Sequence, residues 1–277
     1  MKIGASTSCF YPLETEYALN EVIKLGFNRA EIFFNAPQEL EDCFVKELRN
    51  TADANGVKIV SAHPFSSFLE SNCIFTEYQR RYDYFIDLYK RHCHATALLG
   101  ADIAVIHGAV ERAKRPIPAE MYFERFAKLI EIGKAEGVQV CQENVNLFRS
   151  QTIDFCKQMR DYLGDDFKMV FDIKQAVRAG FDPMAFAQEF KQQIAHIHIS
   201  DHCADMDCMP PGRGNFDFQK LFDLMSGAGY NGSYIIEIYY ALLQKLIRIY
   251  PYVKDEHTYN FLNEKTSIVL EKINALK

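Results

Sequence analysis

Short apolar runs alternate with longer amphipathic segments along the whole chain. The apolar runs have the length of β-strands, and the segments between them have helical periodicity. The expected strands are KIGAST at 2–7, RAEIFF at 29–34, GVKIVSAH at 56–63, ADIAVIHG at 101–108, GVQVCQEN at 137–144, FKMVFDI at 167–173, IAHIHISD at 194–201 and GSYIIEIY at 232–239. The expected helices lie near 14–26, 38–55, 76–99, 119–136, 151–163, 183–192, 218–228 and 259–275. This order predicts parallel strands with helices outside them.

Glycine positions support this register of elements. Glycines lie just past expected helices, where the backbone often turns left-handed, at Gly26, Gly56, Gly100, Gly137 and Gly229. About eight such units in about 250 residues are typical of an α/β fold of the (β/α)8 TIM-barrel type. A doubly wound open sheet is the alternative, disfavoured because no glycine-rich phosphate loop follows the first strand. No Ser/Gly-rich linker interrupts the pattern, so we expect a single domain over residues 1–277.

Composition narrows the classes of partner. The chain of 277 residues is 48% hydrophobic and has a formal net charge of -6. An acidic balance disfavours a nucleic-acid partner, which usually requires a basic face. No apolar run approaches the roughly 20 residues that span a bilayer, and the N-terminus lacks a signal-like apolar segment. We therefore expect no membrane partner and a cytoplasmic location. The eight cysteines form no CxxC pair, and several, such as Cys141, read as reduced core thiols.

Ionisable residues gather where the expected strands end. In a barrel of this kind, active residues collect at the carboxyl ends of the strands. Six successive strands end in such residues: His63, His107, Glu143, Asp172, His198 with Asp201, and Glu237. Charges at that depth are costly unless they are paired or bound to a metal. A divalent ion would offset the repulsion among the three carboxylates, and the neutral imidazole would complete its shell. The expected ligands are Glu143, Asp172, His198 and Glu237.

Each of these residues also has a plainer interpretation. A single Glu at a strand end is often a salt-bridge partner or helix cap, and a single His is often a hydrogen-bonded core residue. His196 lies two residues before His198 and shares its strand face, so we expect it to fill the barrel interior. Asp201 and His202 are consistent with loop residues. The convergence of ligand types on four consecutive strands nevertheless favours a metal site.

The strand-end motifs resemble those of the xylose-isomerase-like sugar isomerases and epimerases. The resemblance covers essentially the full chain and rests on ENVN at Glu143, VFDIKQA at Asp172, IHISD at His198, GRGNFDF at Arg213 and YIIEIY at Glu237. It implies that the Glu, Asp, His and Glu of these motifs bind one divalent metal. It also implies that Arg213 contacts the substrate, although a solvated loop arginine between Gly212 and Gly214 is the competing interpretation.

The resemblance implies a reaction as well as a metal. We expect one divalent ion, with Mn²⁺ favoured and Mg²⁺, Co²⁺ or Zn²⁺ also compatible with the oxygen-rich shell. Such an ion acidifies the C–H bond next to a bound carbonyl, so that a carboxylate can remove the proton through an enediolate. In the resembling epimerases the two glutamates share this work, which assigns Glu143 and Glu237 as the acid/base pair. The expected partner is a small sugar or polyol ketone, and a dehydratase would use the same residues.

The same superfamily contains endonuclease-IV-like enzymes that cut abasic DNA with three zinc ions. Their strand-six motif usually places a histidine where this chain has Gln175, and their glycine-arginine motif is followed by an Asp-x-His pair that GRGNFDF lacks. His63 and His107 do match the first two histidines of that pattern. One metal is therefore favoured, with His63 and His107 reaching the substrate instead. A barrel that binds a sugar without turning it over is a third alternative.

Aromatic residues follow the first three expected strands and are candidates for the walls of a sugar pocket: Phe10, Tyr11, Phe33, Phe34, Phe65 and Phe68. Ordinary packing is the plainer interpretation for each. The segment 239–255 is longer than a usual loop of such barrels and rich in aromatics, which suggests a lid or a subunit contact. A homo-oligomer is compatible with this apolar surface.

Overall fold

The computed structural model describes residues 2–65, 67–111 and 116–238. Within these ranges, eight strands close into a barrel in the order β1-β10-β7-β6-β5-β4-β3-β2. Every neighbouring pair is parallel. The strands are β1 Ile3–Ser6, β2 Arg29–Phe33, β3 Lys58–His63, β4 Ile103–Ile106, β5 Gln139–Glu143, β6 Met169–Asp172, β7 Ile194–Ile199 and β10 Tyr234–Ile236. The (β/α)8 prediction is confirmed, and the open sheet is excluded.

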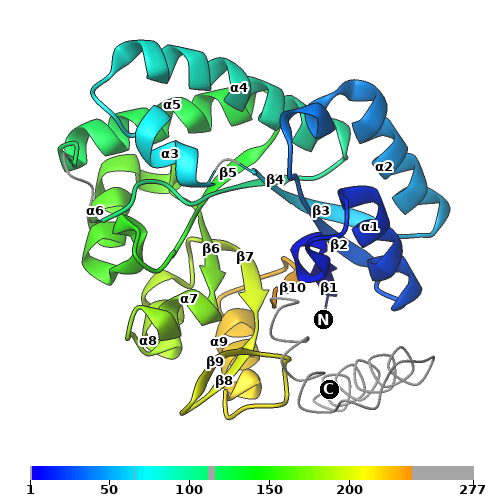
Figure 1. Ribbon diagram of the computed structural model, residues 1–277. Helices are drawn as coiled ribbons and strands as arrows, with labels where there is room; N and C mark the ends of the chain where they lie inside the picture. The colour runs from blue at the N-terminus through cyan, green and yellow to red at the C-terminus, as the bar shows by residue number, and fades with distance from the viewer. Residues whose placement is uncertain (1, 66, 112–115, 239–277) are drawn as a thin grey trace.

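Helices surround the barrel and bury its outer face (Figure 1). The longer ones are α1 Thr15–Lys24, α2 Asp42–Ala54, α4 Gln79–Leu98, α5 Ala119–Ala135, α6 Ile153–Leu163, α8 Pro183–Phe190 and α9 Phe218–Gly227. Their apolar stripes face the strands, as in α8, where Phe186 packs its ring against Phe171 of β6 with centroids 6.2 Å apart. Both rings are fully buried, so this contact belongs to the core between sheet and helices.

Several short elements were not predicted. They are the helices α3 Ser67–Cys73 and α7 Ile173–Arg178, the hairpin of β8 Asp201–Cys203 and β9 Met206–Met209, and the 3-10 turns η1 Thr7–Phe10, η2 Pro37–Leu40, η3 Arg149–Gln151 and η4 Gly164–Asp166. Elements this short offer too few residues for a periodic pattern. The helix expected from residue 76 begins at Gln79. The segment 239–255 and the helix expected at 259–275 lie outside the described residues.

A small apolar cluster lies inside the barrel, separate from the main core. It consists of the fully buried Val105, Cys141 and Val170 on three neighbouring strands. Side chains two residues apart share a strand face, so the inward positions directly above this cluster are 107, 143 and 172. The barrel interior is therefore apolar in this layer and ionisable in the next.

No disulfide joins the eight cysteines, all of which lie in the described ranges, and Cys141 is buried as expected. None of the helices within the described ranges has both the length and the apolar character needed to cross a membrane.

Candidate active site

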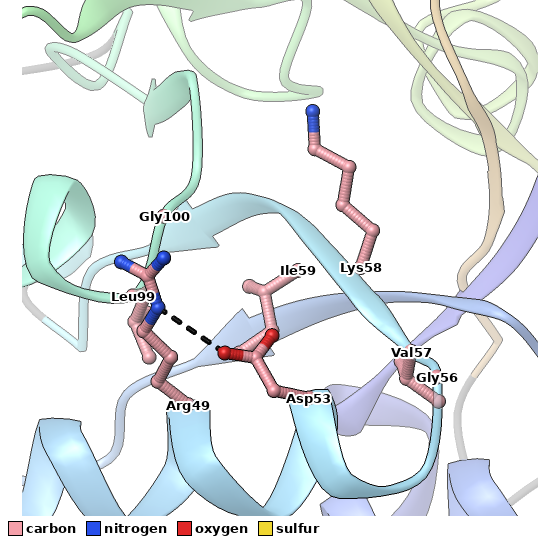
Figure 2. Close-up of a pocket in the computed structure, with 8 residues that line it drawn as sticks. All are labelled: Arg49, Asp53, Gly56, Val57, Lys58, Ile59, Leu99 and Gly100. Atoms are coloured by element: carbon pink, nitrogen blue, oxygen red, sulfur yellow. Dashed lines mark hydrogen bonds and ion pairs between the residues drawn. The ribbon is translucent and has the colours of Figure 1, made fainter.

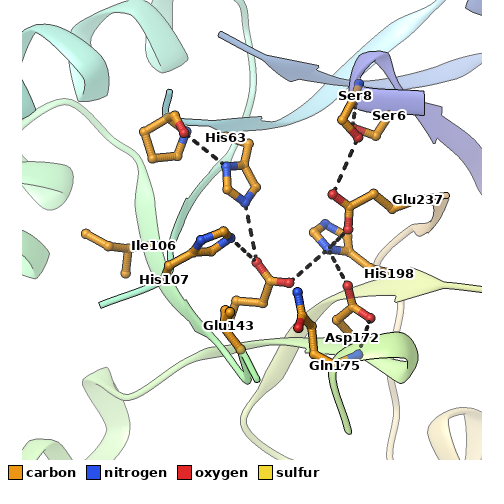
Figure 3. A network of polar contacts seen from close by, with 12 residues as sticks. Ser6, Ser8, His63, Ile106, His107, Glu143, Asp172, Gln175, His198 and Glu237 are labelled. Atoms are coloured by element: carbon orange, nitrogen blue, oxygen red, sulfur yellow. Dashed lines mark hydrogen bonds and ion pairs between the residues drawn. The ribbon is translucent and has the colours of Figure 1, made fainter. Parts of the chain in front are cut away.

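Four ionisable side chains converge at the carboxyl rim of the barrel (Figure 3). Glu143 ends β5, Asp172 ends β6, His198 lies next to the end of β7, and Glu237 directly follows β10. The strand register pairs Asp172 with His198, which places their side chains at one height. None of the four is more than 8% exposed. Each offers one ligand atom within 4.8 Å of the others, so the structure brings together the four residues predicted as metal ligands.

The His198 imidazole faces three carboxylates. Its Nδ1 lies 3.2 Å from Glu237 Oε2 and 3.7 Å from both Glu143 Oε1 and Asp172 Oδ2. None of these contacts has hydrogen-bond geometry, so Nδ1 is a buried nitrogen without a directed partner. Burial by itself would lower the pKa of His198, but the surrounding carboxylates raise it well above its ordinary value. The carboxylates thus strongly favour a positive charge here, which protonated His198 itself supplies in the metal-free protein.

Lys174 supplies a positive charge that the sequence interpretation missed. Its Nζ lies 2.8 Å from Glu237 Oε2 and 3.0 Å from Asp172 Oδ2, and the residue is only 1% exposed. Lysine is almost never buried to this extent without an ionic partner. Burial would raise the pKa of Glu237, but the Lys174 ammonium and His198 hold it far below its ordinary value. For Asp172 burial prevails, and its pKa is raised.

Two histidines hold the outer oxygen of Glu143. His107 Nε2 lies 2.9 Å and His63 Nε2 3.4 Å from Glu143 Oε2, and the two rings meet edge to face at 4.5 Å. Burial would raise the pKa of Glu143, but these contacts, with His107 first, lower it well below its ordinary value. His63, His107 and Glu143 also form a possible ligand group of their own. The predicted substrate-binding histidines therefore lie directly beside the four-residue cluster.

A second layer of polar residues lies behind His198. Its Nε2 is 3.0 Å from Glu31 Oε2, and His196 Nε2 is 3.3 Å from the same oxygen. Ser61 donates its hydroxyl to this oxygen at 2.8 Å. Burial would raise the pKa of Glu31, but the two histidines hold it well below its ordinary value. His196 lies in the barrel interior, as expected. Glu31 was missed, although an acidic residue inside the apolar run RAEIFF was a visible signal.

Asp201 anchors the loop that carries Arg213. It is 1% exposed, and its carboxylate accepts the backbone N–H groups of His202, Gly212, Gly214 and Phe216 at 2.8–3.0 Å. Asp201 thus acts as a loop residue rather than a member of the cluster. The side chain of Arg213 is exposed, and within the described ranges no hydrogen bond or ion pair joins it to the cluster. Its proposed contact with substrate stays a prediction.

The aromatic residues divide between the site and the core. Phe33 stacks on His63 at 4.6 Å and so belongs to the rim. Phe34 follows the plainer interpretation of ordinary packing, because its ring is fully buried and packs against His92 of α4, on the helix side of the sheet. Tyr11 is 65% exposed, while Phe10 and Phe65 are half-buried against the core. The side chain of Phe68 lies outside the described residues.

A hollow of about 350 Å³ lies elsewhere, at the opposite end of β3 (Figure 2). Arg49, Asp53 and Lys58 line it. Arg49 is engaged by Asp53, and Lys58 by Asp102. This hollow has no cluster of ligands or bases, and active residues of such barrels collect at the other rim. It is therefore not the candidate site.

The four-residue cluster fits a divalent ion. Three carboxylates and one imidazole form the oxygen-rich donor set that Mn²⁺, Mg²⁺ and Co²⁺ accept. His198 Nδ1 and Asp172 Oδ2 are both buried without a directed hydrogen bond, although Asp172 is paired with Lys174. An ion among the four residues would use both atoms.

Comparison with known proteins places this chain in a family. A family model described as xylose isomerase-like TIM barrel matches residues 19–252. The chain belongs to this family. D-psicose 3-epimerase from Ruminiclostridium cellulolyticum is 22% identical over 236 residues, 80% of this chain and 77% of that enzyme. Inosose dehydratase from Lacticaseibacillus casei is 23% identical over 257 residues, 80% of this chain and 81% of that enzyme.

Two solved structures share the fold of this chain. A D-tagatose 3-epimerase-like protein superimposes with a TM-score of 0.71 at 20% identity, over 99% of this chain and all of that one. IolI protein with a bound zinc atom superimposes with a TM-score of 0.69 at 17% identity, over 86% of this chain and 89% of that one. At these identities the likeness establishes the fold alone.

Proposed function

We propose that this protein is a divalent-metal-dependent isomerase or epimerase of a sugar or polyol ketone. The observation that carries the proposal is the convergence of Glu143, Asp172, His198 and Glu237 within 4.8 Å at the catalytic rim of the barrel. Similarity to D-psicose 3-epimerase and inosose dehydratase supports a sugar-modifying enzyme. The donor set favours Mn²⁺, with Mg²⁺, Co²⁺ or Zn²⁺ as alternatives.

The residues divide the work by position. When bound, a divalent ion supplies Lewis-acid polarisation of a carbonyl and its neighbouring hydroxyl. Glu143 and Glu237 approach from β5 and β10, with β6 and β7 between them in the barrel. One carboxylate takes the proton from the carbon next to the carbonyl, and the other returns it. Glu143 offers its Oε1 for this task because the two histidines hold its Oε2. His63 and His107 orient substrate hydroxyls.

Exchange of solvent deuterium tests this reaction. The purified protein with Mn²⁺ is incubated in D₂O with a panel of ketoses and inososes, and deuterium next to the carbonyl is followed by mass spectrometry. Glu143→Gln and Glu237→Gln, assayed at saturating Mn²⁺, are expected to lower exchange by about 10²–10⁴-fold. Glu131→Gln, an exposed surface change, is the control. No exchange with any member of the panel would overturn the proposal.

The same purified protein can be used to distinguish the isomerase from two related activities. Inosose dehydratase similarity supports a dehydratase, which would release water after the same proton abstraction. Product analysis distinguishes it, because an epimer or isomer keeps the mass of the substrate. The ligand group His63, His107 and Glu143 is the observation that favours an abasic-site endonuclease. Three zinc ions per chain with cleavage of abasic DNA would favour that enzyme, whereas one ion and no cleavage would support the isomerase.

A further inference from the structure

A buried carboxylate reaches His198 from the far side of the barrel. Glu31 lies on β2, is fully buried, and contacts His198 Nε2 through Oε2 at 3.0 Å. The same oxygen accepts the Ser61 hydroxyl at 2.8 Å. The other oxygen, Oε1, has no hydrogen-bond partner. A buried charge of this kind is costly, so its retention points to a task beyond packing.

The two nitrogens of His198 have different surroundings. Among the described residues, Nε2 pairs with Glu31 on the interior side, whereas Nδ1 faces Glu143, Asp172 and Glu237. A histidine binds a metal through one nitrogen, and the hydrogen bond of the other fixes which nitrogen that is. Here the acceptor behind the ring determines that Nε2 carries the hydrogen. Once a metal ion displaces the Nδ1 proton, the Nδ1 lone pair is directed into the space between the three carboxylates.

We propose that Glu31 is a positioning residue for the metal ligand His198. Its Oε2 accepts the Nε2–H, fixes the ring plane, and leaves Nδ1 as the nitrogen offered to the ion. Ser61 holds Glu31 in turn, and His196 Nε2, 3.1 Å from the Ser61 hydroxyl and 3.3 Å from Glu31, closes the arrangement. The inference rests on the metal site of the proposed function.

Metal affinity measures this role without any substrate. Mn²⁺ alone is titrated into wild type and Glu31→Gln by calorimetry, with folding checked by circular dichroism. We expect Mn²⁺ to bind Glu31→Gln about 10–100-fold more weakly, the usual effect of losing such an outer carboxylate. Ser61→Ala, a smaller change, is expected to weaken binding by less, and it keeps the test valid if Glu31→Gln fails to fold. The control is Thr96→Ala, which removes another fully buried hydroxyl, one that donates to the carbonyl of His92 within α4.

A spectroscopic readout separates positioning from general destabilisation. In ¹⁵N-histidine-labelled protein loaded with Zn²⁺, the His198 Nε2 should carry a slowly exchanging hydrogen, and Nδ1 should be the coordinated nitrogen. Glu31→Leu should speed exchange of that hydrogen. Unchanged Mn²⁺ affinity in Glu31→Gln and Ser61→Ala, or coordination through Nε2, would overturn the inference. Weakened Mn²⁺ binding without deuterium exchange into any sugar would support the inference while the proposed function fails.

Discussion

Lys174 and a divalent ion are expected to compensate the same carboxylates, and Lys174→Met tests this directly. The ammonium lies 2.8 Å from Glu237 Oε2 and 3.0 Å from Asp172 Oδ2. At an effective dielectric constant of about 20, a contact of this length is worth roughly 6 kcal/mol before desolvation. Removing one partner of a buried pair costs about 3–5 kcal/mol net. For a chain of this size the Tm of the metal-free variant should fall by about 10 °C.

Differential scanning calorimetry with and without Mn²⁺ measures the effect. Because the ion neutralises the carboxylates that Lys174 leaves unpaired, the variant should bind Mn²⁺ more tightly and gain more in Tm than wild type. Saturating Mn²⁺ should therefore reduce the Tm difference between wild type and Lys174→Met by at least half. Lys134→Met is the matched control, since its ion pair with Asp166 is exposed and should be worth less than about 1 kcal/mol. If Mn²⁺ leaves this Tm difference unchanged, the ion and Lys174 do not compensate the same carboxylates.

Three further predictions concern the buried carboxyl groups and His198. Burial raises the pKa of Glu70 to about 8, so the folded protein loses stability as the pH rises from the ordinary value near 4.5 through 8. In urea unfolding, the free energy of unfolding of Glu70→Gln should match that of wild type near pH 5 and exceed it by about 3–5 kcal/mol at pH 9. Urea unfolding curves of wild type and Glu70→Gln that coincide at both pH values would contradict this prediction. Asp201→Asn removes one acceptor oxygen from four backbone N–H groups, so hydrogen exchange should speed up at Gly212 and Gly214, and unchanged protection would count against the anchor. Because the pKa of His198 is raised in the metal-free protein, Mn²⁺ should displace about one proton at pH 7 and bind more tightly as pH rises. The proton is detected by calorimetry in buffers of different ionisation enthalpy, and identical binding enthalpies in these buffers would contradict the prediction.

The barrel and the central cluster were accessible from sequence because both depend on local rules. Parallel strands bring their carboxyl ends to one rim, so marking the last residues of each strand was enough to find Glu143, Asp172 and His198. Strand alternation also explains why Phe34 packs in the core. It neighbours Phe33, and adjacent strand residues point to opposite faces, so only Phe33 faces the site.

The supporting residues depend on how the barrel closes. Glu31 and His198 are 167 positions apart, and they meet only because β2 and β7 face each other across the interior. Lys174 enters the cluster through α7, a helix of six residues that Asp172 caps by accepting the N–H of Gln175. No periodic pattern marks so short a helix. Loop geometry such as that of Arg213 depends on backbone turns that composition does not specify.

The Asp201 carboxylate holds its loop by accepting backbone N–H groups, so the loop can be engineered at its side chains. The side chains at 213 and 215 take no part in the anchor, so they can be exchanged in combinatorial libraries while the loop keeps its path. Gly214 is the exception, because a β-carbon there would collide with the carbonyl of His202 and the carboxylate of Asp201. Under the proposed contact of Arg213 with substrate, randomising 213 and 215 around a fixed glycine is expected to alter substrate recognition while leaving the four-residue cluster unchanged.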